Sequence, residues 1–213
     1  MPTSPGNASP NGLRGLLFIW FAAAWLGFSV LPAAAAWTEP PIRINRAEFV
    51  IDSRALPPTD RTDWQTQALP DAWAVNHAKV MAANLSDALI TGWYRLSFKH
   101  PTAPTSLHAV YLPKLGLNAA VFLNGQAIGD GGAFQEPFGR NWNRPLLFPL
   151  PPNVLHPGEN TLYIRVLAHA YTQANLDPVF VGTERQLRPW FERNQFWRIT
   201  LNQSASLMIA AMG

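Results

Sequence analysis

"AAVFLNGQAIGDGGAF" occupies residues 119–134 and carries the clearest local signal in the chain. Its apolar start, residues 119–123, suits a strand that is buried on both faces. Asn124-Gly125 follows at once and favours a two-residue hairpin turn, because both central positions of such a turn need a positive φ angle. Residues 126–128 then run back, and the glycines at 129–132 let the chain turn away. The stretch predicts a tight hairpin inside an antiparallel β domain.

Further β-type segments surround this hairpin at spacings of about ten residues. They lie at 43–51, 92–100, 107–113, 117–125, 145–150 and 160–169, and Pro, Gly or Asn residues separate them. In the second segment Tyr94, Leu96 and Phe98 alternate with more polar residues, which predicts one face in the core. No helical pattern interrupts the series from 92 to 169, so we expect an all-β fold, a β-sandwich over residues 37–182. Residues 56–64 are predicted as a loop.

The N-terminus has the pattern of a secretory leader. A single charge, Arg14, precedes an almost wholly apolar run at 16–31, and "PAAAAW" at 32–37 offers an Ala-x-Ala cleavage site. This order predicts a signal peptide over 1–36. The apolar run is long for a signal peptide, so an uncleaved membrane anchor is the alternative. Both interpretations place the rest of the chain outside the cytoplasm.

The C-terminal part changes character after residue 183. "TERQLRPWFERNQFW" (183–197) is partly helical in pattern and carries several arginines, while residues 199–213 carry no charge. We expect 183–213 to be a connector followed by the start of a transmembrane helix, with aromatic residues at the membrane interface. The alternative is a C-terminal helix packed on the sandwich. The positive-inside rule favours this alternative, because the arginines precede the apolar segment on the exported side.

Charge and cysteine content exclude several functions. The net charge is +3, and removal of 1–36 takes away Arg14 and no acid, which leaves +2. So small an excess gives no reason to expect a nucleic-acid partner. The chain has no cysteine, so it has no disulfide, thiolate metal site or cysteine nucleophile. An exported domain without disulfides must be held by its core, and 9 tryptophans and 12 phenylalanines supply one.

Four motifs in order resemble a known family. These are "WQTQALPDAW" (64–73), "GWYRLSF" (92–98), the hairpin at 119–134 and "HPGENTLYIRV" (156–166). Together they resemble the N-terminal sugar-binding domain of family 2 glycoside hydrolases, a galactose-binding-like jelly roll. The resemblance covers about half of the chain. It implies a jelly-roll β-sandwich and carbohydrate binding.

Two departures from that family stand out. "QEPFGRNWNRPLLFPLPP" (135–152) is longer and richer in proline than the usual return strand, and nothing after residue 170 resembles the rest of such an enzyme. The segment 178–199 is instead similar to the connector of bacterial membrane-bound sensors. In those proteins such a jelly roll lies outside the membrane, ahead of a cytoplasmic histidine kinase or diguanylate cyclase.

No catalytic constellation emerges from the sequence. The closest acid pairs, Asp60 with Asp63 and Asp130 with Glu136, lie in loop-like sequence, where solvated acids are common. The five histidines are scattered, and no two stand at ligand spacing on one element. There is no nucleophile elbow, phosphate-binding loop or kinase signature. We therefore expect no enzyme activity, cofactor or metal in this segment.

A binding site is more consistent with the sequence. Sugars are held by an aromatic ring and a few amide or Arg groups, usually on loops at one end of such a sandwich. The predicted ligand-binding residues fit this composition: Phe134, Gln135, Arg140, Asn141, Trp142, Asn143 and Tyr171. Tyr171 belongs to a facing segment at 169–177. In the other interpretation, Trp142 and Tyr171 cap the core, and the amides satisfy loop backbone. Trp64, Trp73, Trp93 and Tyr94 are predicted to be core, and Arg95 to pair with an acid or cover an aromatic face.

The function predicted from these features is that of a periplasmic sensory domain of a membrane-bound, two-component-type signalling protein. It would be tethered to the inner membrane through 199–213, and also through the leader if this stays uncleaved, with a carbohydrate or other small ligand as its partner. The output domain would be a histidine kinase or diguanylate cyclase. A secreted carbohydrate-binding module, or a non-catalytic domain of a family 2 glycoside hydrolase, is the alternative.

Overall fold

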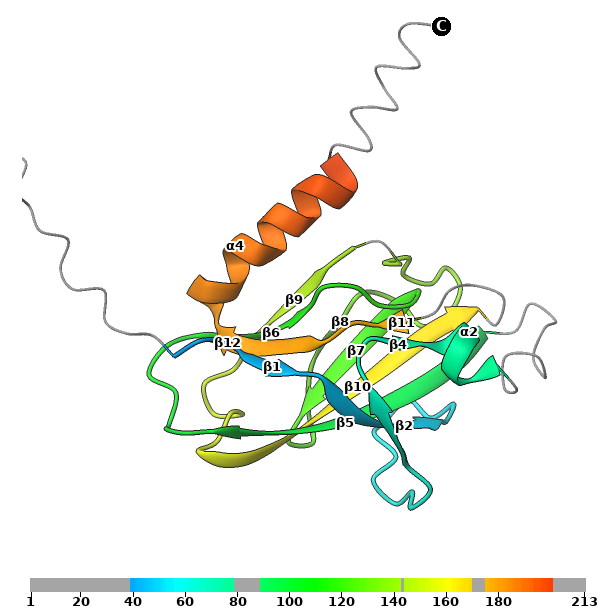
Figure 1. Ribbon diagram of the computed structural model, residues 1–213, viewed down its shortest axis with the longest axis horizontal. Helices are drawn as coiled ribbons and strands as arrows, with labels where there is room; N and C mark the ends of the chain where they lie inside the picture. Colours follow the sequence, from blue (N-terminus) through cyan, green and yellow to red (C-terminus); the bar gives the residue numbers. More distant parts are fainter. Residues whose placement is uncertain (1–38, 79–88, 143, 170–174, 201–213) are drawn as a thin grey trace, which may run out of the picture. The chain divides into compact units, whose positions relative to one another are not determined.

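A computed structural model describes residues 39–78, 89–142, 144–169 and 175–200 (Figure 1). The predicted signal peptide, Asn143 and Tyr171 lie outside these residues, and so does the predicted membrane segment beyond Thr200, residues 201–213. Within the described part, no helix is long and apolar enough to cross a membrane. The leader and the membrane anchor therefore stay predictions.

Two antiparallel sheets form the domain. The six-stranded sheet has the order β3-β2-β5-β10-β7-β8, and its members are β3 (Gln65–Ala68), β2 (Arg46–Ile51), β5 (Leu89–His100), β10 (Gly158–His169), β7 (Asn118–Leu123) and β8 (Gln126–Asp130). The four-stranded sheet has the order β1-β12-β6-β9, with β1 (Ile42–Ile44), β12 (Val179–Thr183), β6 (His108–Leu112) and β9 (Leu146–Leu150). Strands β4 (Asp71–Ala72) and β11 (Asn175–Leu176) form a separate short pair. The predicted all-β sandwich is confirmed.

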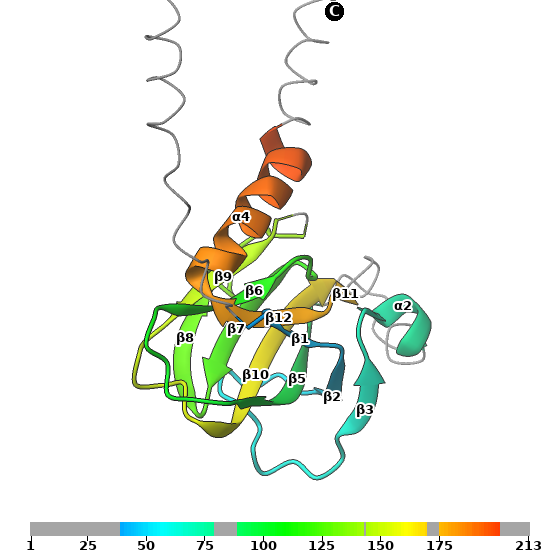
Figure 2. The same ribbon diagram turned by 60° about the vertical axis from the view of Figure 1, so that its left-hand side comes forward.

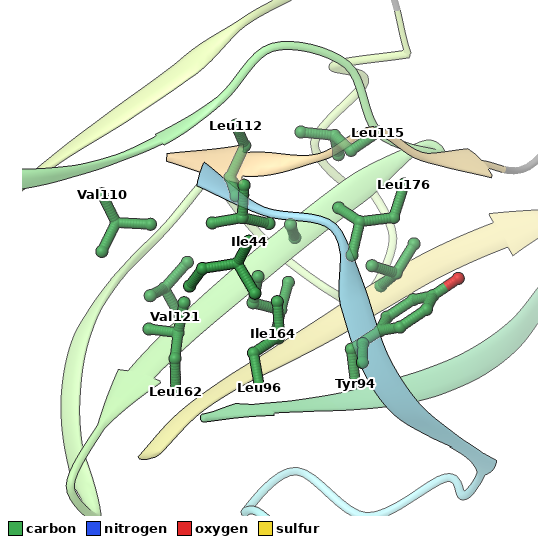
Figure 3. Packing of buried hydrophobic residues seen from close by; sticks show 14 of the residues in the cluster. Ile44, Tyr94, Leu96, Val110, Leu112, Leu115, Val121, Leu162, Ile164 and Leu176 are labelled. Carbon is green, nitrogen blue, oxygen red and sulfur yellow. The ribbon is translucent and has the colours of Figure 1, made fainter. Parts of the chain in front are cut away.

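Alternating side chains fill the space between the sheets. Tyr94, Leu96 and Phe98 of β5 lie in the main core, as the alternation predicts. Leu162 and Ile164 of β10 lie beside them, because β5 and β10 pair along twelve residues each. Figure 3 shows this layer facing apolar side chains of the four-stranded sheet. Burial of this apolar surface supplies the main stabilisation of a domain that has no disulfide.

The predicted hairpin is confirmed, including its turn. β7 and β8 pair directly around Asn124-Gly125, whose φ angles are 51° and 84°. Both angles lie in the left-handed region that a two-residue turn of this type requires. β8 is longer than predicted, since it continues through Gly129 to Asp130.

Several elements were missed by the sequence analysis. Residues 65–68, 71–72, 175–176 and 179–183 form strands, and α2 (Trp73–Asn76) is a single helical turn. Strand 43–51 is interrupted at Asn45, so its two halves join different sheets. These strands are short, and pairing with distant partners rather than local pattern fixes them.

The predicted C-terminal helix is present. α4 (Glu184–Gln195) begins at Thr183 with a capping box, in which the Thr183 side chain and the Gln186 side chain each satisfy the other's backbone N–H group. A π-helical turn, η1 (Phe196–Thr200), continues it. Figures 1 and 2 show α4 following directly from β12.

α4 packs on the outer face of the four-stranded sheet. The buried Leu187 contacts Ala109 and Tyr111 of β6, and Trp190 meets Phe180 with ring centroids 5.4 Å apart. Arg198 donates a hydrogen bond of 2.9 Å to the carbonyl of Pro113. The packed-helix alternative therefore describes residues 184–200.

Candidate functional site

A pocket of about 270 Å³ lies at the edge of the sandwich, where the loop between β8 and β9, strand β9 itself and the end of α4 meet. Its walls combine charged, amide and aromatic side chains. The polar members are Asp130, Asn141, Arg144 and Gln195, and the large apolar members include Phe148, Phe191 and Ile199. Its volume is close to the lower end of the range for small-molecule sites, which is about 300–1,000 Å³.

The sandwich holds the loop wall of this pocket rigidly. Asn141 is buried, and its side-chain Nδ2 donates to Asn118 Oδ1 at 3.0 Å and to the carbonyl of Gly131 at 2.7 Å. Its backbone N–H donates to the carbonyl of Leu117 at 2.6 Å. Asn118 in turn donates to the carbonyls of Gly132 and Ala133. The two asparagines therefore fix the loop on β7.

The charged groups of the pocket remain available to a ligand. Asp130 accepts a hydrogen bond from the backbone N–H of Gly132 at 2.9 Å. Among the residues that the structure describes, neither Asp130 nor Arg144 forms a salt bridge. An Arg and an Asp on one pocket can bond hydroxyl or charged groups of a bound molecule.

The structure separates the predicted ligand-binding residues. Asn141 is the member that lines the pocket. Phe134 is half-buried beneath the guanidinium of Arg165, 4.4 Å from its ring centre, at the outer face of the six-stranded sheet. Gln135, Arg140 and Trp142 are exposed, and Trp142 keeps 63% of its surface. Asn143 and Tyr171 lie outside the described residues.

Two of these residues, Asn141 and Arg140, use their polar groups in contacts within the protein. The Nδ2 atom of Asn141 is used by the loop, as the alternative interpretation of the amides supposed. Arg140 lies over the ring of Phe138 at 5.5 Å. Binding of a ligand by the loop residues stays a prediction, and sequence reasoning missed Asp130, Arg144 and Gln195 because they converge only in the folded chain.

Arg165 of β10 lies on the outer face of the six-stranded sheet, beside Phe134. Its Nη2 donates to the carbonyl of Ser53 at 3.3 Å, while its buried Nε has no hydrogen-bond partner in the described structure. Burial lowers the pKa of Arg165 from its ordinary value. The stacking on Phe134 accounts for its position, so Phe134 serves packing there.

The predicted core aromatics are confirmed, although Trp93 is buried in a cluster apart from the main core. Trp73, Trp93 and Tyr94 are fully buried, and Trp64 is half-buried. Trp93 lies on the outer face of β5, where a sequence alternation would expose it. The loop at 52–64 covers it, and its Nε1 donates to the carbonyl of Arg54 at 3.3 Å.

Arg95 makes both contacts that were expected of it. Its Nε donates to Glu48 Oε2 at 2.6 Å, and its guanidinium lies 4.7 Å from the ring centre of Trp64. The loop acids also have partners, since Asp60 bonds Arg54 and Asp63 bonds Arg61. These acids are structural ion pairs at the surface rather than a paired catalytic site.

A buried polar cluster surrounds Asp71. Tyr94 donates its hydroxyl to Asp71 at 2.6 Å, Asn76 donates at 2.7 Å, and His77 Nε2 lies 3.0 Å away. Burial raises the pKa of Asp71, but these hydrogen bonds outweigh it, so the pKa lies below its ordinary value. Burial and the neighbouring carboxylate raise the pKa of Tyr94. All three side chains bond the buried carboxylate of Asp71, so the cluster serves stability.

Comparisons with known proteins give structural likenesses only. No family model matches the sequence, and no curated protein matches it. Three solved structures illustrate the likenesses. A β-glucuronidase from Ruminococcus gnavus is 14% identical at a TM-score of 0.49, and the match covers 71% of this chain and 30% of that one. A GH2 β-galacturonidase from Eisenbergiella tayi is 12% identical at 0.48, with 68% and 24% covered. A β-mannosidase from Dictyoglomus thermophilum is 14% identical at 0.45, with 60% and 15% covered.

The matched part is a minor share of each of these proteins. The chain spans between 15% and 30% of their lengths in these three matches. The strand pairing described above is what establishes the two-sheet fold.

Proposed function

We propose that this chain is an extracytoplasmic ligand-binding domain that reports a small carbohydrate-like molecule to a membrane-bound signalling protein. The bound molecule would occupy the pocket between the sandwich edge and the end of α4. A histidine kinase or diguanylate cyclase downstream would provide the output. The predicted leader and the apolar segment that follows the helix support the exported, tethered arrangement.

One observation carries this proposal: the pocket takes its walls from both the sandwich and the connector. Asp130, Arg144 and Phe148 belong to the sandwich and its loop, while Phe191, Gln195 and Ile199 belong to α4 and η1. A ligand there would contact the two parts at once. It would therefore shift any equilibrium between docked and displaced forms of the connector, by the difference in its affinity for them.

The chemistry of the walls supports a polyhydroxylated ligand. Phe148 and Phe191 offer apolar ring surface, and Arg144, Asp130 and Gln195 offer charged or amide groups. Sugars present one apolar face and a rim of hydroxyl groups, so a site of this composition complements them. A pocket of about 270 Å³ suits a molecule of roughly monosaccharide size.

A second candidate function places the ligand on the loop surface. Trp142 is exposed over 63% of its area and belongs to the same loop as the exposed Arg140 and Gln135. An exposed indole can stack on the apolar face of a sugar without any help from α4. This arrangement fits a secreted carbohydrate-binding module or an accessory domain of a family 2 glycoside hydrolase.

Calorimetric titration with a panel of monosaccharides, uronic acids and short oligosaccharides tests both candidates. The pocket proposal expects Arg144→Ala to weaken binding at least tenfold, while Arg140→Ala leaves the affinity unchanged. These two arginines lie on one loop and only Arg144 lines the pocket, so the pair is a matched control.

Three outcomes separate the candidates. Loss of affinity in Arg144→Ala alone supports the pocket. Loss in Trp142→Ala alone supports the exposed loop and contradicts the pocket. Failure of the whole panel to bind contradicts the carbohydrate assignment. Circular dichroism of each variant checks that it is folded.

The signalling part needs its own measurement. Hydrogen exchange along α4 and η1 should slow when a ligand that needs Arg144 is bound, since the ligand bridges the helix to the sandwich. A ligand that binds without changing exchange in these two elements would contradict the sensory role and favour a simple binding module.

A further inference from the structure

Two histidines that are eight residues apart meet at one end of the sandwich. His100 is the last residue of β5, and His108 is the first residue of β6. The loop between them joins the six-stranded sheet to the four-stranded sheet. Both residues are largely buried, at 9% and 8% exposure, and their Nε2 atoms are 3.2 Å apart.

The backbone fixes the orientation of each ring. His100 Nδ1 lies 2.6 Å from the carbonyl oxygen of Thr102, and His108 Nδ1 lies 2.8 Å from the carbonyl oxygen of Ser106. A carbonyl oxygen only accepts hydrogen bonds, so each Nδ1 must carry the proton. In the neutral rings both Nε2 atoms then present lone pairs, and these lone pairs face each other.

Two facing lone pairs repel unless a positive centre lies between them. A tautomer change does not remove the conflict, because it would turn an unprotonated Nδ1 toward a carbonyl oxygen. A proton or a metal ion shared by the two Nε2 atoms would resolve it. Neither ring forms a salt bridge with a carboxylate in the described part of the chain, so no protein anion there offsets a shared positive charge.

The distance between the ring centres separates a straight hydrogen bond from convergence on one metal ion. A straight Nε2–H···Nε2 hydrogen bond of this length would place the ring centres about 5.5 Å apart. Two rings whose Nε2 lone pairs converge on one zinc ion, with Zn–N bonds of about 2.0–2.1 Å and a tetrahedral angle, have nitrogens about 3.3 Å and centres about 5 Å apart. The observed centres are 4.9 Å apart, with the ring planes at 83°. The geometry matches convergence on one ion.

We propose that His100 and His108 bind a divalent transition-metal ion, zinc in the first instance, through their two Nε2 atoms. Imidazole nitrogen is a favoured ligand of Zn²⁺, Cu²⁺ and Ni²⁺. A ligating histidine ordinarily donates its other N–H group to a carbonyl or carboxylate, which is the arrangement that Thr102 and Ser106 provide.

The remaining coordination positions belong to water or to a small ligand. Among the residues that the structure describes, no group of three or more His, Cys, Asp or Glu side chains could hold a metal. Zinc sites ordinarily have three or four protein ligands, so we expect this two-ligand site to bind the ion more weakly than they do. The ion would link the ends of β5 and β6, beside Thr183, which pairs with His108.

The full chain without a histidine tag, stripped with a chelator, is the sample for the test. Titration calorimetry with ZnCl₂ should show one ion per chain, and Zn²⁺ should raise the melting temperature. His100→Gln and His108→Gln should each weaken zinc binding at least tenfold. His169→Gln is the matched control, because His169 pairs with Leu89 at the opposite end of β5 from His100, and it should bind zinc like the unaltered chain.

A measurement on the unaltered chain keeps the proposal testable if a variant fails to fold. Long-range ¹⁵N nuclear magnetic resonance should show the Nε2 signals of two histidines shifting with one equivalent of Zn²⁺, while their Nδ1–H signals persist. Absence of any zinc response, or a response confined to other histidines, overturns the proposal. A proton shared between the rings with no zinc response overturns it in favour of the hydrogen bond.

Discussion

The side-chain amide of Asn124 donates a hydrogen bond of 2.8 Å to Oδ1 of Asn160, which is 36 residues further along the chain. The same amide donates to the carbonyl of Val154, and Asn124 Oδ1 accepts from the backbone N–H of Thr161. Asn160 closes its own turn through the backbone of His156 and Gly158. Two of the motifs that carry the family resemblance, 119–134 and 156–166, therefore contact each other. The role of Asn124 and Asn160 in this contact is structural.

Asn124→Gly should destabilise the protein even though glycine is the residue that best tolerates a positive φ angle. The turn keeps its conformation, but three hydrogen bonds to β10 and its preceding loop are lost, at a cost of about 1–3 kcal/mol. Urea unfolding measures the change. Gln126→Ala, at an exposed neighbouring position, should leave the midpoint unchanged. Equal stability of Asn124→Gly and the unaltered chain would show that the turn angle alone matters.

Tyr94→Phe should cost about 2–3 kcal/mol, because it removes a hydrogen bond to a buried carboxylate. The Tyr94 hydroxyl also accepts a hydrogen bond of 2.6 Å from Trp73 Nε1, which the variant leaves without its acceptor. A double-mutant cycle with Asp71→Asn isolates the pair. Additive losses would contradict the coupling that the 2.6 Å distance between Tyr94 and Asp71 implies.

Protonation of Asp71 should contribute to the loss of unfolding free energy at acid pH. Its pKa in the folded chain is below the ordinary value of 3.8, so the unfolded chain binds a proton more readily. The stabilisation is complete above pH 3.8 and is lost as the pH drops through the lower folded value. Unfolding free energies between pH 2 and pH 6 measure it. The same slope in Asp71→Asn as in the unaltered chain would assign the loss to other groups, such as Asp52 beside Arg54.

Asp177 should behave in the opposite sense. Burial raises its pKa, and the attraction of Lys114 and Arg198 does not compensate. Its contribution is favourable below the ordinary value of 3.8 and is lost as the pH rises through the higher folded value. Asp177→Asn should therefore melt at a higher temperature than the unaltered chain at pH 7, and the difference should vanish near pH 3. A lower melting temperature at pH 7 would refute this.

Local sequence signals were sufficient where a structure is fixed within a few residues. The Asn124-Gly125 turn, the alternation through Tyr94 and the helical pattern at 183–197 are of this kind, and each is present. The alternation puts Trp93 on the face of β5 opposite Tyr94, but the loop that buries it there could not be predicted, because the carbonyl of Arg54 that it bonds is 39 residues away.

The candidate sites were harder to predict for the same reason. The pocket unites Arg144 and Gln195, which are far apart in the sequence and lie on unlike elements. His100 and His108 stand on two strands in different sheets, so no helical or strand spacing links them. The loop composition did identify Asn141, which lines the pocket, although its amide nitrogen is used internally.

Gly92→Ala should be strongly destabilising, because a Cβ atom there would lie 2.5 Å from the Phe49 ring and 2.6 Å from the Trp73 ring. These rings are buried in the core, so they must shift, at a cost of about 1–3 kcal/mol. Gly129→Ala is the control, since its Cβ would meet the Phe148 ring at 3.0 Å and needs a smaller adjustment. Thermal unfolding should rank Gly92→Ala below Gly129→Ala, and the reverse order would contradict the packing described.

Leu187→Ala should loosen α4 while leaving the sandwich intact. Leu187 is fully buried against Ala109 and Tyr111, on the outer face of β6, whereas the main core lies on the other face. Removing its side chain costs about 2–5 kcal/mol if the surroundings do not relax. Since α4 packs on the outer face of the four-stranded sheet, away from the main core, we expect this loss to appear as local opening of the helix. Hydrogen exchange should quicken over α4 and stay slow in β5 and β10.

Any ligand of the pocket should bind more weakly to Leu187→Ala too, because α4 carries Phe191 and Gln195. Glu192→Ala, at an exposed position of the same helix, should change neither. Equal acceleration of exchange in β5 would show that helix and sandwich unfold as one unit, and this would contradict the proposed signalling, which requires α4 to move separately.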